Sequence, residues 1–351
     1  MSDHHHPHDG NAEPIPLEGE TWAPPAEDDN AATASANSGL RYVFLGKDGL
    51  RAGWSLLIFL ALVVGCAMLS FFTLRTLHIK PPVGEKVNGV IEGLPSGTLF
   101  SHGIMLVILL AISLLMSVIE RRRFGVYGLD ALTGHRIKQF VVGLFWGLVM
   151  LSLLVFTLKA TGFLVFDGFA LSGSAAFLYG LKWAGAFLLV GLAEEYMLRG
   201  YLQFTLSRGI AGILGDSAHR KAIGFWIAAL FFAFIFGLGH KNNPGESPLG
   251  LIMAGMVSLV FCLSLWRTGS LWWAVGWHAA WDWAESYLYG VADSGTMSKG
   301  HLINSHAVGA PLMSGGTTGP EGSIFVIPIL ILTALIIVFT LRPESWPSNQ
   351  E

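Results

Sequence analysis

The sequence is short of charged residues. Asp, Glu, Lys and Arg make up 13% of its 351 residues, whereas hydrophobic residues make up 52%. A soluble globular domain carries about 25% charged residues, so this composition excludes a chain that lies wholly in water. Most of the chain is therefore predicted to lie in a lipid bilayer, with membrane lipid as its surroundings. The formal net charge is only −3, which gives no basic excess for binding nucleic acid, and no nucleic-acid partner is expected.

Cysteine is also scarce. The two cysteines, Cys66 and Cys262, each lie in an apolar run. A disulfide framework or a cysteine metal cluster needs more cysteines than this, so each is interpreted as a small buried hydrophobe. Two catalytic patterns are missing as well. The sequence contains neither a Gly-x-Ser-x-Gly nucleophile nor a His-Glu-x-x-His zinc helix.

What the sequence does contain is about eight apolar stretches long enough to cross roughly 30 Å of hydrocarbon. In lipid each is predicted to be a helix, because every backbone donor and acceptor needs a partner within the segment. The stretches are Gly53–Leu74, Gly103–Ile119, Phe140–Leu158, Ala176–Ala193, Ala222–Gly239, Leu249–Trp266, Ser270–Tyr289 and Ile324–Leu341. The predicted fold is all-α: a polytopic membrane helix bundle over residues 41–345. Residues 1–40, rich in Asp, Glu, Asn, Ala and Pro, are predicted to be a disordered tail.

Basic residues near the ends of these stretches predict the orientation. With eight crossings they all fall on one side of the membrane. They are Arg41, Lys47, Arg51, Arg121, Arg122, Arg123, Arg136, Lys138, Arg208, Arg220, Lys221, Arg267 and Arg342. We therefore expect a multi-pass integral membrane protein of a bacterial plasma membrane, with both termini cytoplasmic.

Two adjacent glutamates, Glu194 and Glu195, follow an uncharged apolar run that ends at Ala193. A charge at the bilayer centre costs roughly 2.5–3.5 kcal/mol on insertion scales, so carboxylates in such a place indicate function. Glu195 and Arg199 are four residues apart and share a helix face, which predicts an ion pair that gives Glu195 a structural role. Glu194 is rotated by about 100° and is free to act as a general base. The alternative is that both glutamates only mark the cytoplasmic end of the span.

Two histidines lie in later apolar stretches. His240 ends the fifth and shares a helix face with Phe236; a histidine at a span end is otherwise interfacial. His278 and Asp282 are four residues apart in the seventh, so both reach one point, as paired metal ligands or as a histidine oriented by a carboxylate. Glu285 is expected to extend their face. The alternative is a polar ladder that joins helices.

These motifs resemble a known family. Glu194-Glu195-x-x-x-Arg199-Gly200-x-Leu202-x-x-x-Leu206, then Phe236-x-x-x-His240, then His278-x-x-x-Asp282 resemble, in order and separation, the three motifs of the CPBP family. That family includes the CAAX prenyl endopeptidases and the bacteriocin-processing or immunity proteins also called the Abi family. The resemblance covers about residues 178–290, which we take as the protease core.

The resemblance implies an intramembrane endopeptidase with a helical-bundle fold. By analogy, Glu194 and His240 hold and deprotonate the attacking water. His278 and Asp282 orient the substrate carbonyl or stabilise its oxyanion, and Arg199 locks Glu195. The eukaryotic prenyl-protein enzymes carry Asn at the position of Asp282. An ionised Asp repels an oxyanion, which favours a metal-ligand role or a protonated Asp282.

Family members are described both as metalloproteases and as metal-independent glutamate proteases. The sequence leaves open whether Glu194, His240, His278 and Asp282 hold a divalent metal such as zinc or work without one. The expected substrate is a peptide, or a membrane-associated or lipid-modified protein. Two other functions are weighed against hydrolysis: a noncatalytic immunity or scaffold protein of the same fold, and a transporter whose intramembrane Glu and His residues relay protons or bind an ion.

The stretch limits conflict with a shared site. They place Glu194 toward the cytoplasmic end of the fourth helix and His240 at the opposite end of the fifth. Helices rise about 1.5 Å per residue, so the two side chains meet only if these limits move. A shared site therefore predicts that the fourth helix continues to about Leu206 and that the fifth kinks or ends around Gly237 and Gly239.

Overall fold

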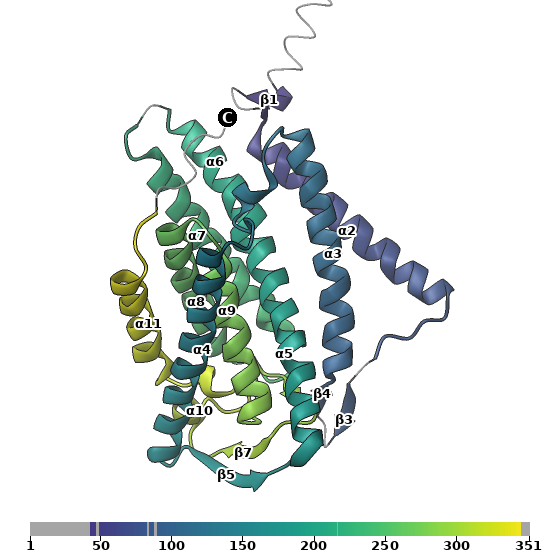
Figure 1. Cartoon of the computed structure of the whole chain (residues 1–351), viewed down its shortest axis with the longest axis vertical. Helices are drawn as coiled ribbons and strands as arrows, with labels where there is room; N and C mark the ends of the chain where they lie inside the picture. Colours follow the sequence, from purple (N-terminus) through teal and green to yellow (C-terminus); the bar gives the residue numbers. More distant parts are fainter. Residues whose placement is uncertain (1–42, 47–48, 83, 88–89, 216, 345–351) are drawn as a thin grey trace, which may run out of the picture. The chain divides into compact units, whose positions relative to one another are not determined.

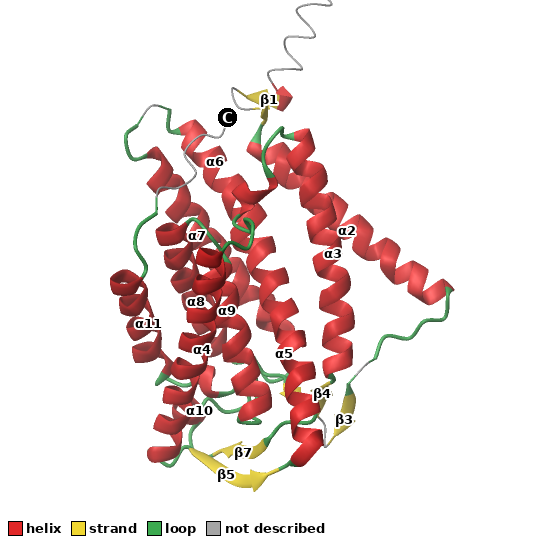
Figure 2. Ribbon diagram, viewed as in Figure 1, coloured by secondary structure: helices red, strands yellow, loops and turns green. Residues whose placement is uncertain are grey.

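The computed structural model describes residues 43–46, 49–82, 84–87, 90–215 and 217–344, and most of these residues are helical (Figure 1). Figure 2 shows that helices dominate these ranges and that strands are few and short. The predicted disordered tail, residues 1–40, lies outside the described residues. The helical bundle is as predicted from the apolar stretches, whereas the short strands were not predicted.

Within these ranges, six helical segments are long and apolar enough to cross a membrane. They are α2 (Ala52–Thr76), α3 (Pro95–Ile119), α4 (Gly134–Ala160), Gly173–Ile213, Arg220–Asn242 and α8 (Pro248–Thr268). The fourth comprises α5 (Gly173–Glu195), the π-helix η2 (Tyr196–Leu202) and α6 (Gln203–Ile213); the fifth comprises α7 (Arg220–Gly239) and the 3₁₀ turn η3 (His240–Asn242). The six correspond to the first six apolar stretches of the sequence.

The last two predicted spans are shorter. The seventh is α9 (Trp272–Asp282) continued by the π-helix η4 (Trp283–Leu288), and the eighth is α11 (Val326–Thr340), which has 15 residues. At 1.5 Å per residue α11 extends about 22 Å, less than the roughly 30 Å of a hydrocarbon core. The structure contains both helices, and a count of eight crossings stays a prediction.

Short elements fill the connections between these helices. The strands are β1 (Leu45–Gly46), β2 (Gly49–Leu50), β3 (Glu85–Val87), β4 (Val90–Gly93), β5 (Leu164–Phe169), β6 (Met297–Ser298) and β7 (Ile303–Ala307). β1 pairs with β2, β4 lies between antiparallel β3 and parallel β6, and β5 pairs antiparallel with β7 across a register shift between Phe166 and Gly168. The remaining short helices are η1 (Phe124–Tyr127), α10 (Pro311–Ser314) and η5 (Pro320–Gly322).

The sequence marks where several of the long helices begin and end. The Thr133 side chain accepts a hydrogen bond from the Arg136 amide at the start of α4, and the Ser247 side chain accepts one from the Gly250 amide at the start of α8. Such N-caps satisfy amides that have no partner inside the helix. α8 ends at Gly269, whose φ of 63° is the left-handed conformation that glycine adopts without strain.

α9 is the helix around which the site is built. All ten residues from Trp273 to Asp282 are buried, because α9 contacts α4, α5 and α8. Its closest neighbour is α4, and glycines make that approach possible. A Cβ on Gly143 or Gly147 of α4, or on Gly276 of α9, would collide with the backbone of the facing helix. Small residues allow membrane helices to approach closely, so this packing holds α9 at a fixed depth.

Candidate active site

A cavity of about 480 Å³ lies among α5, α7, α8 and α9. All four residues that the sequence indicates for catalysis line it: Glu194, His240, His278 and Asp282. They come from three helical segments, and the helix limits explain how they meet. The segment Gly173–Ile213 passes Glu194 without a break, so Glu194 lies near its middle, while α7 ends at Gly239 and His240 begins η3. The fourth helix thus continues past the predicted Ala193, as a shared site requires, whereas α7 ends at Gly239, the predicted limit, and is followed by the 3₁₀ turn η3.

The acidic residues of the site lie where α-helix changes to π-helix. Glu194 and Glu195 end α5 directly before η2, and Asp282 ends α9 directly before η4. A π turn is wider than an α turn, and such turns are frequent at functional sites. The wider winding changes which residues share a face, and this explains one difference from the sequence analysis. Glu285, expected beside His278 and Asp282, lies in η4 and belongs to a separate acidic cluster.

Glu195 is the centre of a buried ion pair. Its side chain and that of Arg199 are both 0% exposed, and Oε1 of Glu195 lies 3.0 Å from Nη1 of Arg199. The same oxygen lies 3.0 Å from Nδ1 of His278. A carboxylate only accepts hydrogen bonds, so Nδ1 of His278 carries the hydrogen. The ion pair follows from the i,i+4 spacing, but the contact with His278, which fixes the orientation of its ring, was not predicted.

Two aromatic rings hold the Arg199 guanidinium. Its Cζ lies 4.3 Å from the ring centroid of Phe236 and 5.5 Å from that of Phe261. Cation–π contacts of this kind stabilise a desolvated arginine. Phe261 also stacks on the His278 ring at 5.6 Å. The motif residue Phe236 therefore stabilises the charge of Arg199. Phe261 has a similar contact, but it lies in an apolar run, where nothing in the sequence sets it apart from its neighbours.

His240 is oriented by the same phenylalanine. Nδ1 of His240 lies 2.8 Å from the backbone carbonyl of Phe236, and the two rings meet edge to face at 4.8 Å. A carbonyl oxygen accepts, so Nδ1 donates the hydrogen bond. In the neutral imidazole Nε2 is then an acceptor. His240 can therefore receive a hydrogen bond from a water molecule in the cavity that it lines.

Nε2 of His278 faces two further carboxylates. It lies 3.4 Å from Oδ2 of Asp282 and 4.0 Å from Oε2 of Glu194. Nδ1 of His278 already carries a hydrogen, so in the neutral imidazole Nε2 presents a lone pair. An ionised Asp282 also presents lone pairs, and the two atoms would repel each other. One proton must therefore lie between them, either on the imidazole or on the carboxyl group. The Glu194 side chain is 25% exposed, against 9% for Asp282. Of these two carboxylates, Glu194 is thus the more exposed.

The four candidate residues fit a metal ion poorly as they stand. Among the described His, Cys, Asp and Glu residues, three ligand atoms within 4.8 Å of one another occur in a different group, formed by Glu285, Asp293 and Glu321. Glu194, His240, His278 and Asp282 do not form such a group. Zinc needs three or four ligand atoms at about 2.0–2.3 Å.

Two acidic residues at the cavity wall were missed by the sequence analysis. Asp293 and Glu321 both line the cavity, and both come from the Gly- and Ser-rich segment after η4. Neither lies in a periodic helix, so spacing could not place them. The only available signal was the presence of carboxylates in a loop otherwise rich in small residues.

With this geometry in place, comparison with known proteins gives one match. Residues 176–284 match the family model described as type II CAAX prenyl endopeptidase Rce1-like, which is consistent with the CPBP resemblance. No curated protein and no solved structure matches the chain. The matched residues contain every candidate catalytic residue and both π-helix junctions, although η4 continues beyond them.

Proposed function

We propose that this chain is an intramembrane endopeptidase in which Glu194 activates a water molecule, because residues 176–284 match the family model of the Rce1-like type II CAAX prenyl endopeptidases. The family match supports an intramembrane protease. The assignment of roles rests on the different environments of the two glutamates. Glu195 is buried and paired with Arg199, whereas Glu194 is partly exposed at the wall of the cavity.

In the proposed reaction, water in the cavity donates a hydrogen bond to Nε2 of His240 and gives its other proton to Glu194. The resulting hydroxide attacks the carbonyl carbon of the scissile peptide bond. The proton that His278 and Asp282 share then lies next to the developing oxyanion and stabilises it. Glu194 finally passes its proton to the leaving amine. Because this proton lies beside the oxyanion, Asp282 does not repel the oxyanion as an ionised, unprotonated Asp282 would.

The apolar walls of the cavity suit a membrane-associated substrate. They include Trp183, Phe187, Trp277 and Trp281. Such surfaces bind apolar chains, and the few polar groups orient the reacting bond. We infer that the substrate is a peptide, or a protein associated with the membrane or carrying a lipid. For the topology we propose that α9–η4 and α11 complete eight crossings and that both termini are cytoplasmic. The connection from α3 to α4 is basic, with Arg121 shortly after α3 and Arg136 and Lys138 at the start of α4.

Cleavage of a farnesylated, internally quenched Cys-a-a-X peptide by the purified, reconstituted protein tests this proposal. Replacing a general base costs on the order of 10²–10⁴ in rate, so Glu194→Gln is expected to lose at least about a hundredfold. Glu92→Gln is the matched control, because Glu92 lies on β4 and does not line the cavity. A melting curve for each variant separates lost chemistry from lost structure.

Two results would overturn the proposal. One is a folded Glu194→Gln variant that cleaves at the wild-type rate. The other is wild-type protein that cleaves neither this peptide nor its unprenylated form, which would favour the noncatalytic scaffold. Elemental analysis of active protein, with activity before and after chelation, decides between the metal-free mechanism and one in which these side chains rearrange around a metal.

A further inference from the structure

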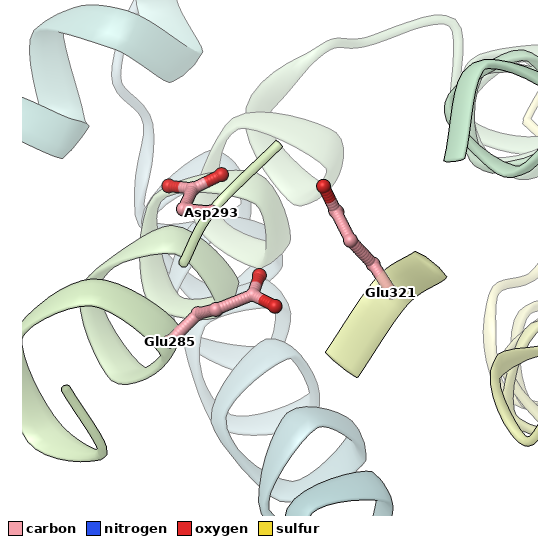
Figure 3. Close-up of side chains that lie close together, drawn as sticks. All are labelled: Glu285, Asp293 and Glu321. Carbon is pink, nitrogen blue, oxygen red and sulfur yellow. The ribbon is translucent and has the colours of Figure 1, made fainter. Parts of the chain in front are cut away.

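Three carboxylates crowd together beside the catalytic residues. Glu285 comes from η4, Asp293 from the loop that follows and Glu321 from η5. One oxygen atom from each lies within 4.8 Å of the other two. Figure 3 shows the three side chains close together, with the carboxyl group of Glu285 below those of Asp293 and Glu321. Like charges this close repel one another, so the cluster needs a counter-charge or a proton.

Glu285 supplies a second and independent observation. Its side chain is fully buried, and neither carboxylate oxygen has a hydrogen-bond partner in the described part of the chain. None of the three residues forms an ion pair with a basic side chain in the same ranges. A buried ionised group without a partner costs several kcal/mol. The protein thus places a buried carboxylate without a hydrogen-bond partner beside two other carboxylates, which points to a ligand that the cluster binds.

The other two carboxylates are held in position. Oδ2 of Asp293 lies 3.2 Å from the Ser286 hydroxyl. Oε1 of Glu321 accepts hydrogen bonds from both the amide and the hydroxyl of Ser294, at 2.8 and 2.6 Å. The backbone also closes around Glu285, since a Cβ on Gly319 would lie 3.3 Å from its Oε1. These contacts fix the oxygen atoms before any ligand arrives, which lowers the entropy cost of binding.

We propose that Glu285, Asp293 and Glu321 bind a calcium ion. The donor set is all oxygen, which suits hard cations and not zinc or copper. Calcium accepts monodentate or bidentate carboxylates in irregular geometry, whereas magnesium demands a near-ideal octahedron and keeps most of its water. The Gly- and Ser-rich segment, which contains Asp293 and Glu321, lies at the end of the bundle opposite the connection between α3 and α4 (Figure 1). In the proposed topology this end faces away from the cytoplasm. Calcium sites outside the cytoplasm bind with dissociation constants of about 10⁻⁴–10⁻³ M.

The ion would join three separate segments at the edge of the active-site cavity. Asp293 and Glu321 also line that cavity, so calcium at this site ties its wall to the end of the helix that carries His278 and Asp282. The site is a structural clamp and does not depend on hydrolysis. Its test therefore uses binding and stability, which report on it even if the chain proves to be noncatalytic.

The experiment is a calcium titration of the full-length protein in detergent after treatment with a chelator. Calorimetry gives the affinity, and the melting temperature gives the coupling to the fold. We expect calcium to bind and to raise the melting temperature, and magnesium to do so much less. Glu285→Gln and Asp293→Asn should bind calcium at least about tenfold more weakly, since even indirect ligand contacts are worth that much. Asp167→Asn, an exposed carboxylate on β5 paired with His306, should bind like wild type.

Two outcomes would overturn the site. One is wild-type protein with no binding and no stabilisation at millimolar calcium. The other is unchanged calcium affinity in Glu285→Gln, which would place any bound calcium elsewhere. If Glu285→Gln does not fold, Asp293→Asn decides alone, because its side chain lies in a loop and its loss leaves the helix intact.

Discussion

Replacing Arg199 with methionine tests the buried ion pair between Arg199 and Glu195, which gives Glu195 a different environment from Glu194. Methionine retains most of the length and the apolar stem but removes the charge. Arg199 and Glu195 are both 0% exposed, so the substitution leaves a buried carboxylate whose remaining contact is Nδ1 of His278 at 3.0 Å. The variant should therefore unfold more readily than wild type.

The size of the effect follows from the geometry. Two unit charges 3.0 Å apart attract by about 5.5 kcal/mol at an effective dielectric constant near 20. Removing one partner of a buried pair typically destabilises a protein by about 3–5 kcal/mol. The lost contact with the Phe236 ring, at 4.3 Å, adds roughly 1–2 kcal/mol when the cation is desolvated. We expect a loss of at least about 3 kcal/mol.

Denaturant-dependent unfolding in detergent, followed by tryptophan fluorescence, measures this loss. Arg75→Met is the matched control, because Arg75 is exposed at the end of α2 and should change stability by less than about 0.5 kcal/mol. The double variant Glu195→Gln/Arg199→Met should be more stable than Arg199→Met, since it leaves no uncompensated charge. A single Arg199→Met variant within about 1 kcal/mol of wild type would refute the reasoning.

Three further outcomes are expected. Asp282→Asn should keep most of the hydrolytic activity while Asp282→Leu loses it, because an amide N–H can replace the shared proton; equal loss in both would contradict that role. Gly147→Ala should lower the melting temperature because the added methyl group meets the α9 backbone, while Gly65→Ala on α2, with open space around it, should leave it unchanged or raise it. Phe236→Leu should lower stability by about 1–2 kcal/mol through its contact with Arg199, and an unchanged unfolding curve would remove that contact from the account.

The helices could be predicted from the sequence, and the four residues that it indicates for catalysis line one cavity; their roles stay a prediction. A long apolar run allows one structure in lipid, so the first six stretches correspond to helices. Most limits differ by a few residues, but α3 begins eight residues earlier than predicted and the fourth segment continues to Ile213, twenty residues beyond Ala193. The i,i+4 spacings of Glu195 with Arg199 and of His278 with Asp282 correctly placed each pair on one face. The short strands could not be predicted, because segments of two to six residues carry too little periodicity.

Most features of the site that could not be predicted from the sequence are contacts between distant segments. Nothing in its neighbourhood indicates that Glu195 touches His278, 83 residues away. The departure of Glu285 from the expected face has a different origin, since η4 is wound as a π-helix and a 3.6-residue period no longer applies. Asp293 lies in a loop and Glu321 in the three-residue helix η5, and only tertiary structure brings them to Glu285.

The two π-helices bear on which changes in chain length this protein can tolerate. A π turn holds about one residue more than an α turn, so deleting one residue within Tyr196–Leu202 would let the segment rewind as an ordinary α-helix while α5 and α6 kept nearly their present relative rotation. The wide turn directly after Glu194 and Glu195 would be lost, and a deletion in Trp283–Leu288 would remove the one directly after Asp282. In a library of single-residue deletions scanned along the chain, folded variants are therefore expected at these two turns, whereas deletions inside the long α-helices should unfold the protein.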